Sequence, residues 1–346
     1  MNLDRPSLDA AVARSILTGD QADELWKFLR DSGKDTPGFR FAHVLYYLGG
    51  VVAIAAMTLF MTKGWERFGG TGIFAIAAVY LVIALVLTTY LQRRAHPVPA
   101  GLTGALAVAL VPLAVYGAQV MLGYWPETTM GYRDYHYRID WRWLMMEFAT
   151  LFAAAAMLQR LRLPFMTMPL AVTLWYMSMD IVPFLYGDDR WDWELRKYVS
   201  VWFGLAMTLV AFWIDVRSRK ENKDYAFWLY LFGVLTFWGG LSLLDSGSAL
   251  GKFLYLCINV AMIFIGAVLG RRVFAVFGGI GVAIYLGDLA GKVFRDSMLF
   301  PLALSLIGLG VVGIGILWQK REETISRRLR AFLPDDLREL IERRAA

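Results

Sequence analysis

Charged residues and cysteine are both scarce in this 346-residue chain. Only 18% of its residues are charged, against roughly a quarter in average soluble proteins, and it has one cysteine. A single cysteine excludes an intrachain disulfide and a cysteine-based metal site, and Cys257 lies within an apolar stretch. The first 40 residues carry seven carboxylates and no early apolar run, so we expect no signal peptide.

Apolar sequence arranged in long blocks is what the chain has instead. Hydrophobic residues make up 58% of the sequence and aromatic residues 15%. The apolar residues gather in runs of about 20 with almost no charge, which is the length that crosses a bilayer as a helix. This pattern predicts an all-α, polytopic transmembrane helical bundle. It excludes a secreted disulfide scaffold, a disordered chain, a Rossmann enzyme and a DNA-binding domain.

Windows of about 20 apolar residues predict ten spanning helices. Their approximate ranges are 41–62, 71–91, 98–122, 142–158, 164–186, 198–216, 225–244, 249–270, 273–290 and 298–318. The predicted domains are therefore a cytoplasmic helical hairpin at 1–40, a transmembrane bundle at 41–318 and a basic amphipathic tail at 319–346.

The Lys and Arg residues predict that both termini face the cytoplasm. With the tails inside, the four short inner loops hold ten Lys and Arg, and the five longer outer loops hold eleven. The density of positive charge is then at least about twofold higher inside, as the positive-inside rule requires. The net charge of +6 is mostly this signature, so we expect no nucleic-acid partner.

The two tails carry amphipathic helices. The hairpin is predicted as helices at about 7–16 and 19–31, with Thr18 or Asp20 as the second N-cap. From Lys320 onward, apolar and basic side chains alternate at helical spacing, so we expect the tail to bind anionic lipid headgroups. For the hairpin, packing against the membrane and a role in binding another protein are both open.

No cluster of residues points to a cofactor, a metal or a catalytic centre. His43, His96 and His136 belong to a span, an inner loop and an outer loop, so the three histidines cannot meet. A Gly-x-Gly-x-x-Gly match at 308–313 lies within a predicted span, where it is typical of close helix packing rather than of nucleotide binding.

Three carboxylates within the predicted spans are the main candidates for function: Glu147, Asp180 and Asp288. An ionisable group at the centre of a span costs roughly 2.5–3.5 kcal/mol, so each should face the bundle interior or water and have a partner. Counted from the ends of their spans, all three lie about 6–10 Å below the outer boundary. Gln119, in the outer part of the third span, and Asn259, near the middle of the eighth, complete the predicted polar set.

Each carboxylate also has a purely structural interpretation. Asp288 would pair with Lys292 one turn away, Glu147 would reach interfacial water, and Asp180 would accept a hydrogen bond from a Tyr or Trp. Asp180 also precedes Pro183 by three residues, and this proline would free the backbone carbonyl of Met179 beside the carboxylate.

The N-terminal part resembles a known family. The segments that carry the resemblance are Ala-Val-Ala-Arg-Ser-Ile-Leu-Thr-Gly-Asp-Gln-Ala-Asp-Glu-Leu at 11–25, Tyr-Tyr-Leu-Gly-Gly at 46–50 and Lys-Gly-Trp at 63–65. They are similar to the bacterial membrane proteins grouped as domain of unknown function 2157, most clearly over about the first 90 residues. The resemblance implies a multi-pass protein of the bacterial cytoplasmic (inner) membrane and transfers no catalytic residues.

The leading functional hypothesis is that a small solute, cation or proton binds in an outward-facing polar pocket between helices. Asp180 would be its principal charge, Glu147 and Asp288 would act as co-ligands or proton carriers, and Asn259 would form a polar stop. The rival hypothesis is a noncatalytic scaffold or assembly factor that acts through the tails. A membrane enzyme is the third, and it lacks a nucleophile or metal triad on one face.

Overall fold

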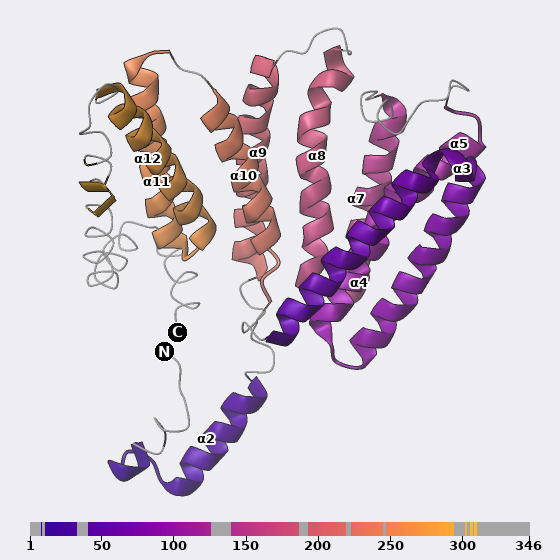
Figure 1. Cartoon of the computed structure of the whole chain (residues 1–346). Helices are drawn as coiled ribbons and strands as arrows, with labels where there is room; N and C mark the ends of the chain where they lie inside the picture. Colours follow the sequence, from indigo (N-terminus) through magenta and orange to yellow (C-terminus); the bar gives the residue numbers. More distant parts are fainter. Residues whose placement is uncertain are drawn as a thin grey trace. The chain divides into compact units, whose positions relative to one another are not determined.

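The computed structural model describes residues 8, 11–32, 41–125, 140–186, 193–218, 223–244 and 247–293, together with five positions between 302 and 309. Every regular element in these ranges is a helix, as the all-α prediction requires (Figure 1). The chain divides into two compact units, residues 1–52 and 53–346. The tail predicted at 319–346 lies outside the described residues.

In the first unit, helix α2 (Gly19–Ser32) begins at the predicted capping residue Thr18. The backbone N–H of Gln21 donates to Thr18 Oγ1 over 3.3 Å, and the backbone N–H of Thr18 donates to Gln21 Oε1 over 3.0 Å. This reciprocal capping box satisfies two N–H groups that the first helical turn leaves without partners. Along α2, Ala22 is buried and only 1% exposed.

Helix α3 (Phe41–Arg93) contains two of the predicted spans, separated at Gly69. Gly69 has φ 59° and ψ −179°, a backbone conformation that is open to glycine and strained for other residues. The helix therefore breaks there. The segment Phe68–Arg93 is long and apolar enough to cross a membrane.

The remaining helices alternate with short connections. They are α4 (Pro97–Ala109), α5 (Val111–Met121), α7 (Trp141–Leu161), the short 3-10 helix η1 (Pro164–Met166), α8 (Thr167–Tyr186), α9 (Trp193–Ser218), α10 (Phe227–Leu243), α11 (Ala249–Leu269) and α12 (Arg272–Val293). Between α4 and α5, Pro112 stands in the first turn of α5 and lacks an N–H to donate, so the chain bends at Leu110 and continues. The helix α8 runs through Pro183 to Tyr186.

Seven helical segments of the described chain are long and apolar enough to cross a membrane. They correspond to the second to sixth, the eighth and the ninth predicted spans. The seventh predicted span appears as α10, an apolar helix of 17 residues. The tenth, at 298–318, lies mostly outside the described residues, so the count of ten and the side on which the termini lie stay predictions.

Close helix packing in the second unit depends on glycines. A Cβ atom at Gly204 of α9 would collide with the backbone N of Phe237 on α10, and one at Gly240 would come within 2.8 Å of the Lys197 carbonyl oxygen. Between α11 and α12, the side chain of Asn259 occupies the place of a Cβ at Gly281. Small residues allow such approach where lipid replaces the hydrophobic effect between helices.

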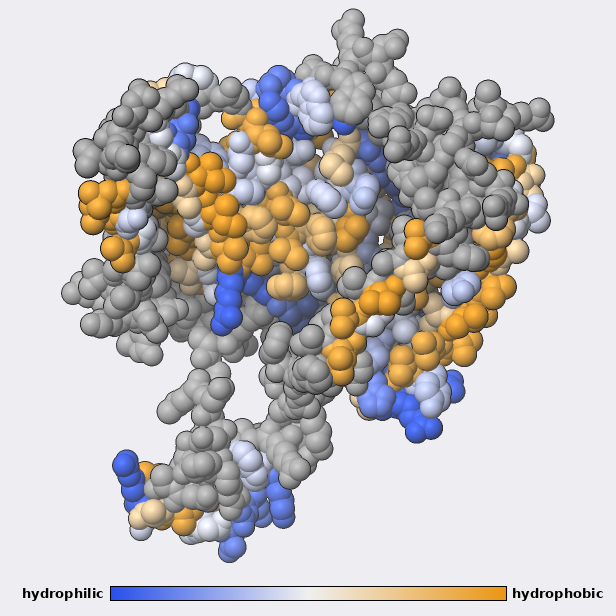
Figure 2. All heavy atoms as spheres, viewed as in Figure 1, coloured by the Kyte–Doolittle hydropathy of each residue, from blue (hydrophilic) through white to orange (hydrophobic). Residues whose placement is uncertain are grey.

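The largest buried cluster joins α8, α9, α10, α11 and α12, and it includes Met207, Leu229, Tyr230, Met262 and Phe274. The outer surface of the helices is apolar as well: Phe152 of α7 is 78% exposed and Trp202 of α9 is 68% exposed. Figure 2 shows hydrophobic residues over much of the coloured surface in view. Large exposed apolar side chains of this number are what a surrounding bilayer requires.

Candidate functional site

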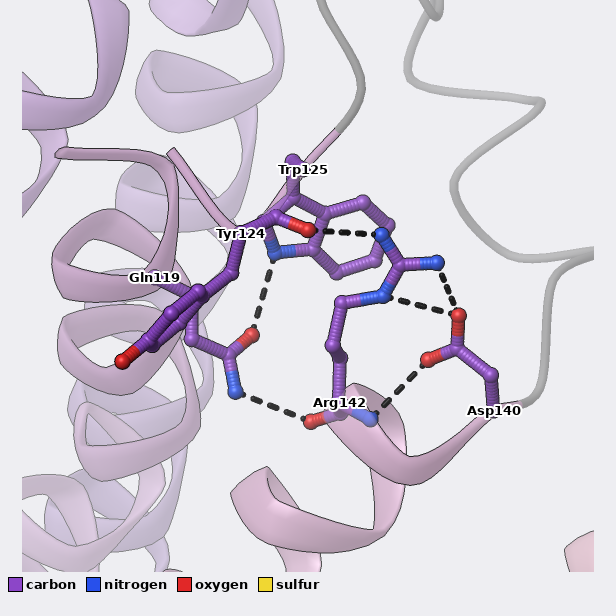
Figure 3. A network of polar contacts seen from close by, with 5 residues as sticks. All are labelled: Gln119, Tyr124, Trp125, Asp140 and Arg142. Carbon is purple, nitrogen blue, oxygen red and sulfur yellow. Dashed lines mark hydrogen bonds and ion pairs between the residues drawn. The ribbon is translucent and has the colours of Figure 1, made fainter. Parts of the chain in front are cut away.

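A polar network fixes the start of α7, the helix that carries Glu147 (Figure 3). Asp140 caps the helix by accepting the Arg142 backbone N–H over 2.9 Å, and it also accepts from the Arg142 guanidinium. Arg142 Nη1 donates to the Tyr124 carbonyl oxygen over 2.9 Å, and the guanidinium carbon lies 4.5 Å from the centre of the Trp125 ring. The network therefore ties the first turn of α7 to the chain that follows α5.

Gln119 of α5 completes this network. Its Nε2 donates to the Arg142 carbonyl oxygen over 3.1 Å, and its Oε1 accepts from Trp125 Nε1 over 3.0 Å. Gln119 is 1% exposed and both halves of its amide have partners: one holds α5 against α7, and the other binds the chain that follows α5. Gln119 therefore helps to position the start of α7, next to the candidate site.

Asp140 lies just before α7, and its pKa is shifted by the other groups of the network. Burial alone would raise its pKa, but hydrogen bonds from the side chain and backbone of Arg142 outweigh burial and lower the pKa below its ordinary value. The carboxylate is therefore held ionised opposite the arginine.

Glu147 and Asp180 come together between α7 and α8. Each is 7% exposed, and their carboxyl groups lie close enough to interact electrostatically. The indole Nε1 of Trp143, one turn before Glu147, donates to Asp180 Oδ2 over 2.7 Å. The positive charge of Arg196 on α9 also acts on Asp180. Three helices therefore contribute to one buried, charged cluster.

Glu147 is the unusual member of this cluster. Neither of its carboxyl oxygens has a hydrogen-bond partner of normal geometry in the part of the chain that the structure describes. Buried polar atoms are satisfied in the great majority of cases, and a buried carboxyl group without a partner is costly. An exogenous proton, cation or water would supply what the two oxygens lack.

The other two predicted residues have partners elsewhere. Asp288 Oδ2 accepts from Lys252 Nζ over 2.9 Å, which forms a half-exposed ion pair between α11 and α12. Asn259 is fully buried, accepts from Trp238 Nε1 over 3.1 Å and donates to the Tyr255 carbonyl oxygen over 2.8 Å. Of the five predicted residues, Glu147 and Asp180 contact one another, and Gln119 supports the helix beneath them.

A second buried charge cluster escaped the sequence analysis. Arg271, in the turn between α11 and α12, is 6% exposed and binds Asp215 with two nitrogens, over 2.7 and 3.1 Å. It also forms an ion pair with Asp224, and its guanidinium lies 5.2 Å from the centre of the Tyr230 ring.

The protonation of this second cluster follows from its partners. Burial would lower the pKa of Arg271, but the hydrogen bonds that it donates to Asp224 and Asp215 outweigh burial and raise the pKa above its ordinary value. The arginine therefore stays charged, and its guanidinium group is occupied by the two carboxylates. This cluster joins α9, the start of α10 and the α11–α12 turn, so we interpret it as structural. The sequence contained one indication of this cluster, because a buried Asp needs a cation nearby. The charges at the ends of the predicted spans were used only to predict which side of the membrane each loop faces.

Within the described residues, no group of three or more His, Cys, Asp or Glu side chains is arranged to hold a metal ion. The Glu147–Asp180 pair has two carboxyl groups and no third ligand of these types. Calcium sites usually provide about six to eight oxygen ligands, so two carboxyl groups alone are few for a bound divalent metal.

Comparison with known proteins agrees with the resemblance in the N-terminal part. Residues 10–164 match the family model described as predicted membrane protein, domain of unknown function 2157. The match covers α2, α3, α4, α5 and α7, and so includes Glu147. No curated protein and no solved structure matches the chain.

Proposed function

We propose that this chain, a membrane protein matching the family of domain of unknown function 2157 over residues 10–164, binds a proton or a monovalent cation between Glu147 and Asp180. The observation that carries the proposal is the buried Glu147 carboxyl group: neither of its oxygens has a hydrogen-bond partner of normal geometry among the described residues, and the Asp180 carboxyl group lies close enough to interact with it. An unsatisfied pair of this kind is a binding site for positive charge.

The charges of the cluster favour one positive charge as the ligand. Ionised Glu147 and Asp180 contribute two negative charges, and Arg196 contributes one positive charge. The remaining single negative charge is neutralised by one proton or one monovalent cation, whereas a divalent cation would leave a net positive charge. Neutrality matters in these low-dielectric surroundings. An uncompensated charge at the centre of a span costs at least about 2.5 kcal/mol on insertion scales and more in simulations.

The position of the pair suits exchange with one side of the membrane. Glu147 lies in the second turn of α7, and Asp180 lies within two turns of the end of α8. Both are therefore near the same end of an antiparallel helix pair, which the distribution of Lys and Arg predicts to be the outer one. The rival hypothesis of a scaffold that acts through the tails predicts that changes to this pair leave function intact.

Proteoliposomes that contain a pH-sensitive dye test the proposal. With an imposed proton or Na⁺ gradient, the full chain should change the internal pH faster than empty liposomes, and Glu147→Gln or Asp180→Asn should abolish the difference. Glu194→Gln is the matched control, because it removes a carboxylate that is 63% exposed at the start of α9. Asp288→Asn is a separate arm, which asks whether the third carboxylate takes part. Flux that persists in both pair variants would overturn the proposed site, and a full chain no faster than empty liposomes would favour the scaffold instead.

A further inference from the structure

A groove opens between four helices at the opposite end of α7 from Glu147. It lies where α7 and α9 end and where α8 and α10 begin, and its volume is about 480 Å³. Arg162, Arg217 and Ser218 form a polar side, and Leu158, Leu170 and Ile214 form an apolar side. We call this surface the Arg162–Arg217 groove.

The two arginines of the groove are available to a ligand. Neither forms an ion pair with any residue that the structure describes, and both are exposed. The acidic residues of this region, Asp215 and Asp224, are already bound to Arg271. Arg271 therefore already holds the two carboxylates that would otherwise pair with Arg162 and Arg217.

The backbone at Arg162 is held in an unusual conformation. Arg162 has φ 50° and ψ 36°, the left-handed conformation in which glycine is the usual residue at a helix C-terminus. Its carbonyl oxygen accepts from Tyr225 OH over 2.8 Å and from Lys223 Nζ over 3.4 Å. A third cation, Lys223, is thereby brought beside the same end of the groove.

We propose that the Arg162–Arg217 groove binds one anionic phospholipid, with its phosphate against the arginines and the first part of an acyl chain against the leucines. Guanidinium groups bind phosphate through several hydrogen bonds at once. Basic pockets between spanning helices are suited to anionic headgroups, and the apolar side of the groove suits an acyl chain and not a free anion. The site is separate from the Glu147–Asp180 pair and does not depend on the function proposed for it.

The purified full chain can be tested by native mass spectrometry with phosphatidylglycerol and phosphatidylcholine of identical acyl chains. We expect a preference for phosphatidylglycerol of roughly 10- to 30-fold, as two surface cations provide. Arg162→Gln combined with Arg217→Gln should remove this preference and one tightly held lipid. Arg93→Gln combined with Arg94→Gln, which removes two arginines at the end of α3, should leave both unchanged.

Two further arms distinguish the alternatives. Ser218→Trp keeps both arginines but fills the groove, so it should also release the lipid; it decides the question if the double arginine variant does not fold. Inorganic phosphate should not displace phosphatidylglycerol, and displacement at millimolar phosphate would indicate a free-anion site and overturn the proposal. An unchanged phosphatidylglycerol preference in Arg162→Gln/Arg217→Gln, or an equal loss in Arg93→Gln/Arg94→Gln, would overturn it too.

Discussion

The indole Nε1 of Trp143 donates a hydrogen bond to Oδ2 of Asp180 over 2.7 Å. The two residues are 37 positions apart in sequence, and the bond joins the neighbouring helices α7 and α8. Trp143 stands one turn before Glu147, so the same helix that brings the donor also brings the second carboxyl group. Tryptophan has a single N–H and no acceptor, so it orients Asp180 without neutralising it. The charge of the pair is left for Arg196 and a bound ion to balance.

Replacing Trp143 with Phe tests this orientation. The change removes the N–H and keeps most of the apolar surface, so we expect a loss of about 1 to 2 kcal/mol in the free energy of unfolding. Thermal unfolding of the detergent-solubilised chain measures the loss. Trp141→Phe is the control, since Trp141 is 53% exposed and should change stability by less than about 0.5 kcal/mol. Equal effects of the two changes would contradict the role assigned to Trp143.

Arg271→Gln should be far more damaging than Arg272→Gln. The first change leaves the buried carboxylate of Asp215 without its cation, for which losses of about 3 to 5 kcal/mol are typical. Arg272 is the adjacent, exposed arginine and has the same charge and length. Chemical unfolding of both variants under one condition gives the comparison. A similar, small loss in both would show that the cluster around Arg271 stabilises nothing.

Two neighbouring glycines of α10 make a matched pair. A Cβ at Gly240 would lie 2.8 Å from the Lys197 carbonyl oxygen on α9, whereas one at Gly239 meets no atom within 4 Å. Gly240→Ala should therefore cost about 1 to 3 kcal/mol by forcing the helices apart. Gly239→Ala should be neutral or stabilising by up to about 1 kcal/mol, because alanine restricts the unfolded chain. The two melting temperatures, measured side by side, check the prediction, and the reverse order would contradict it.

The pH dependence of stability should reveal Asp140. Because its pKa is lowered in the folded chain, its contribution is complete above the ordinary carboxylate pKa of about 4 and is lost as the pH falls below that value. Asp140→Asn keeps a capping side chain but removes the charge opposite Arg142. Wild type should therefore exceed this variant in stability at pH 7, and the difference should shrink toward pH 3. A difference that is constant with pH would contradict the ion pair.

The sequence predicted the elements that depend on runs of apolar residues. Seven of the ten predicted spans coincide with helices of spanning length, because a run of about 20 apolar residues has few other stable outcomes. The predicted spans at 41–62 and 71–91 left a connection between them, but hydropathy did not indicate that the helix would continue as far as a break at Gly69. The bend at Leu110 lies within one predicted span and was not predicted.

The candidate site was predictable only in part. Glu147 and Asp180 stood out because a carboxylate within a span is expensive, and their contact follows from equal depth on consecutive antiparallel helices. The partners Trp143 and Arg196, and the pairing of Asp288 with Lys252, depend on how each helix is rotated about its axis. The Arg271 cluster was missed because its carboxylates lie 47 and 56 residues away in sequence.

Infrared difference spectroscopy of the purified chain in lipid tests the central claim most directly, because it detects a protonated buried carboxyl group. If Glu147 and Asp180 share a proton, wild type in Na⁺-free buffer at pH 7 should show a carboxylic acid band that disappears in Glu147→Gln and in Asp180→Asn. The band should persist in Glu194→Gln and decrease when Na⁺ competes for the same site. A carboxylic acid band that survives both pair variants, or its absence from wild type under Na⁺-free conditions, would contradict the proposed site.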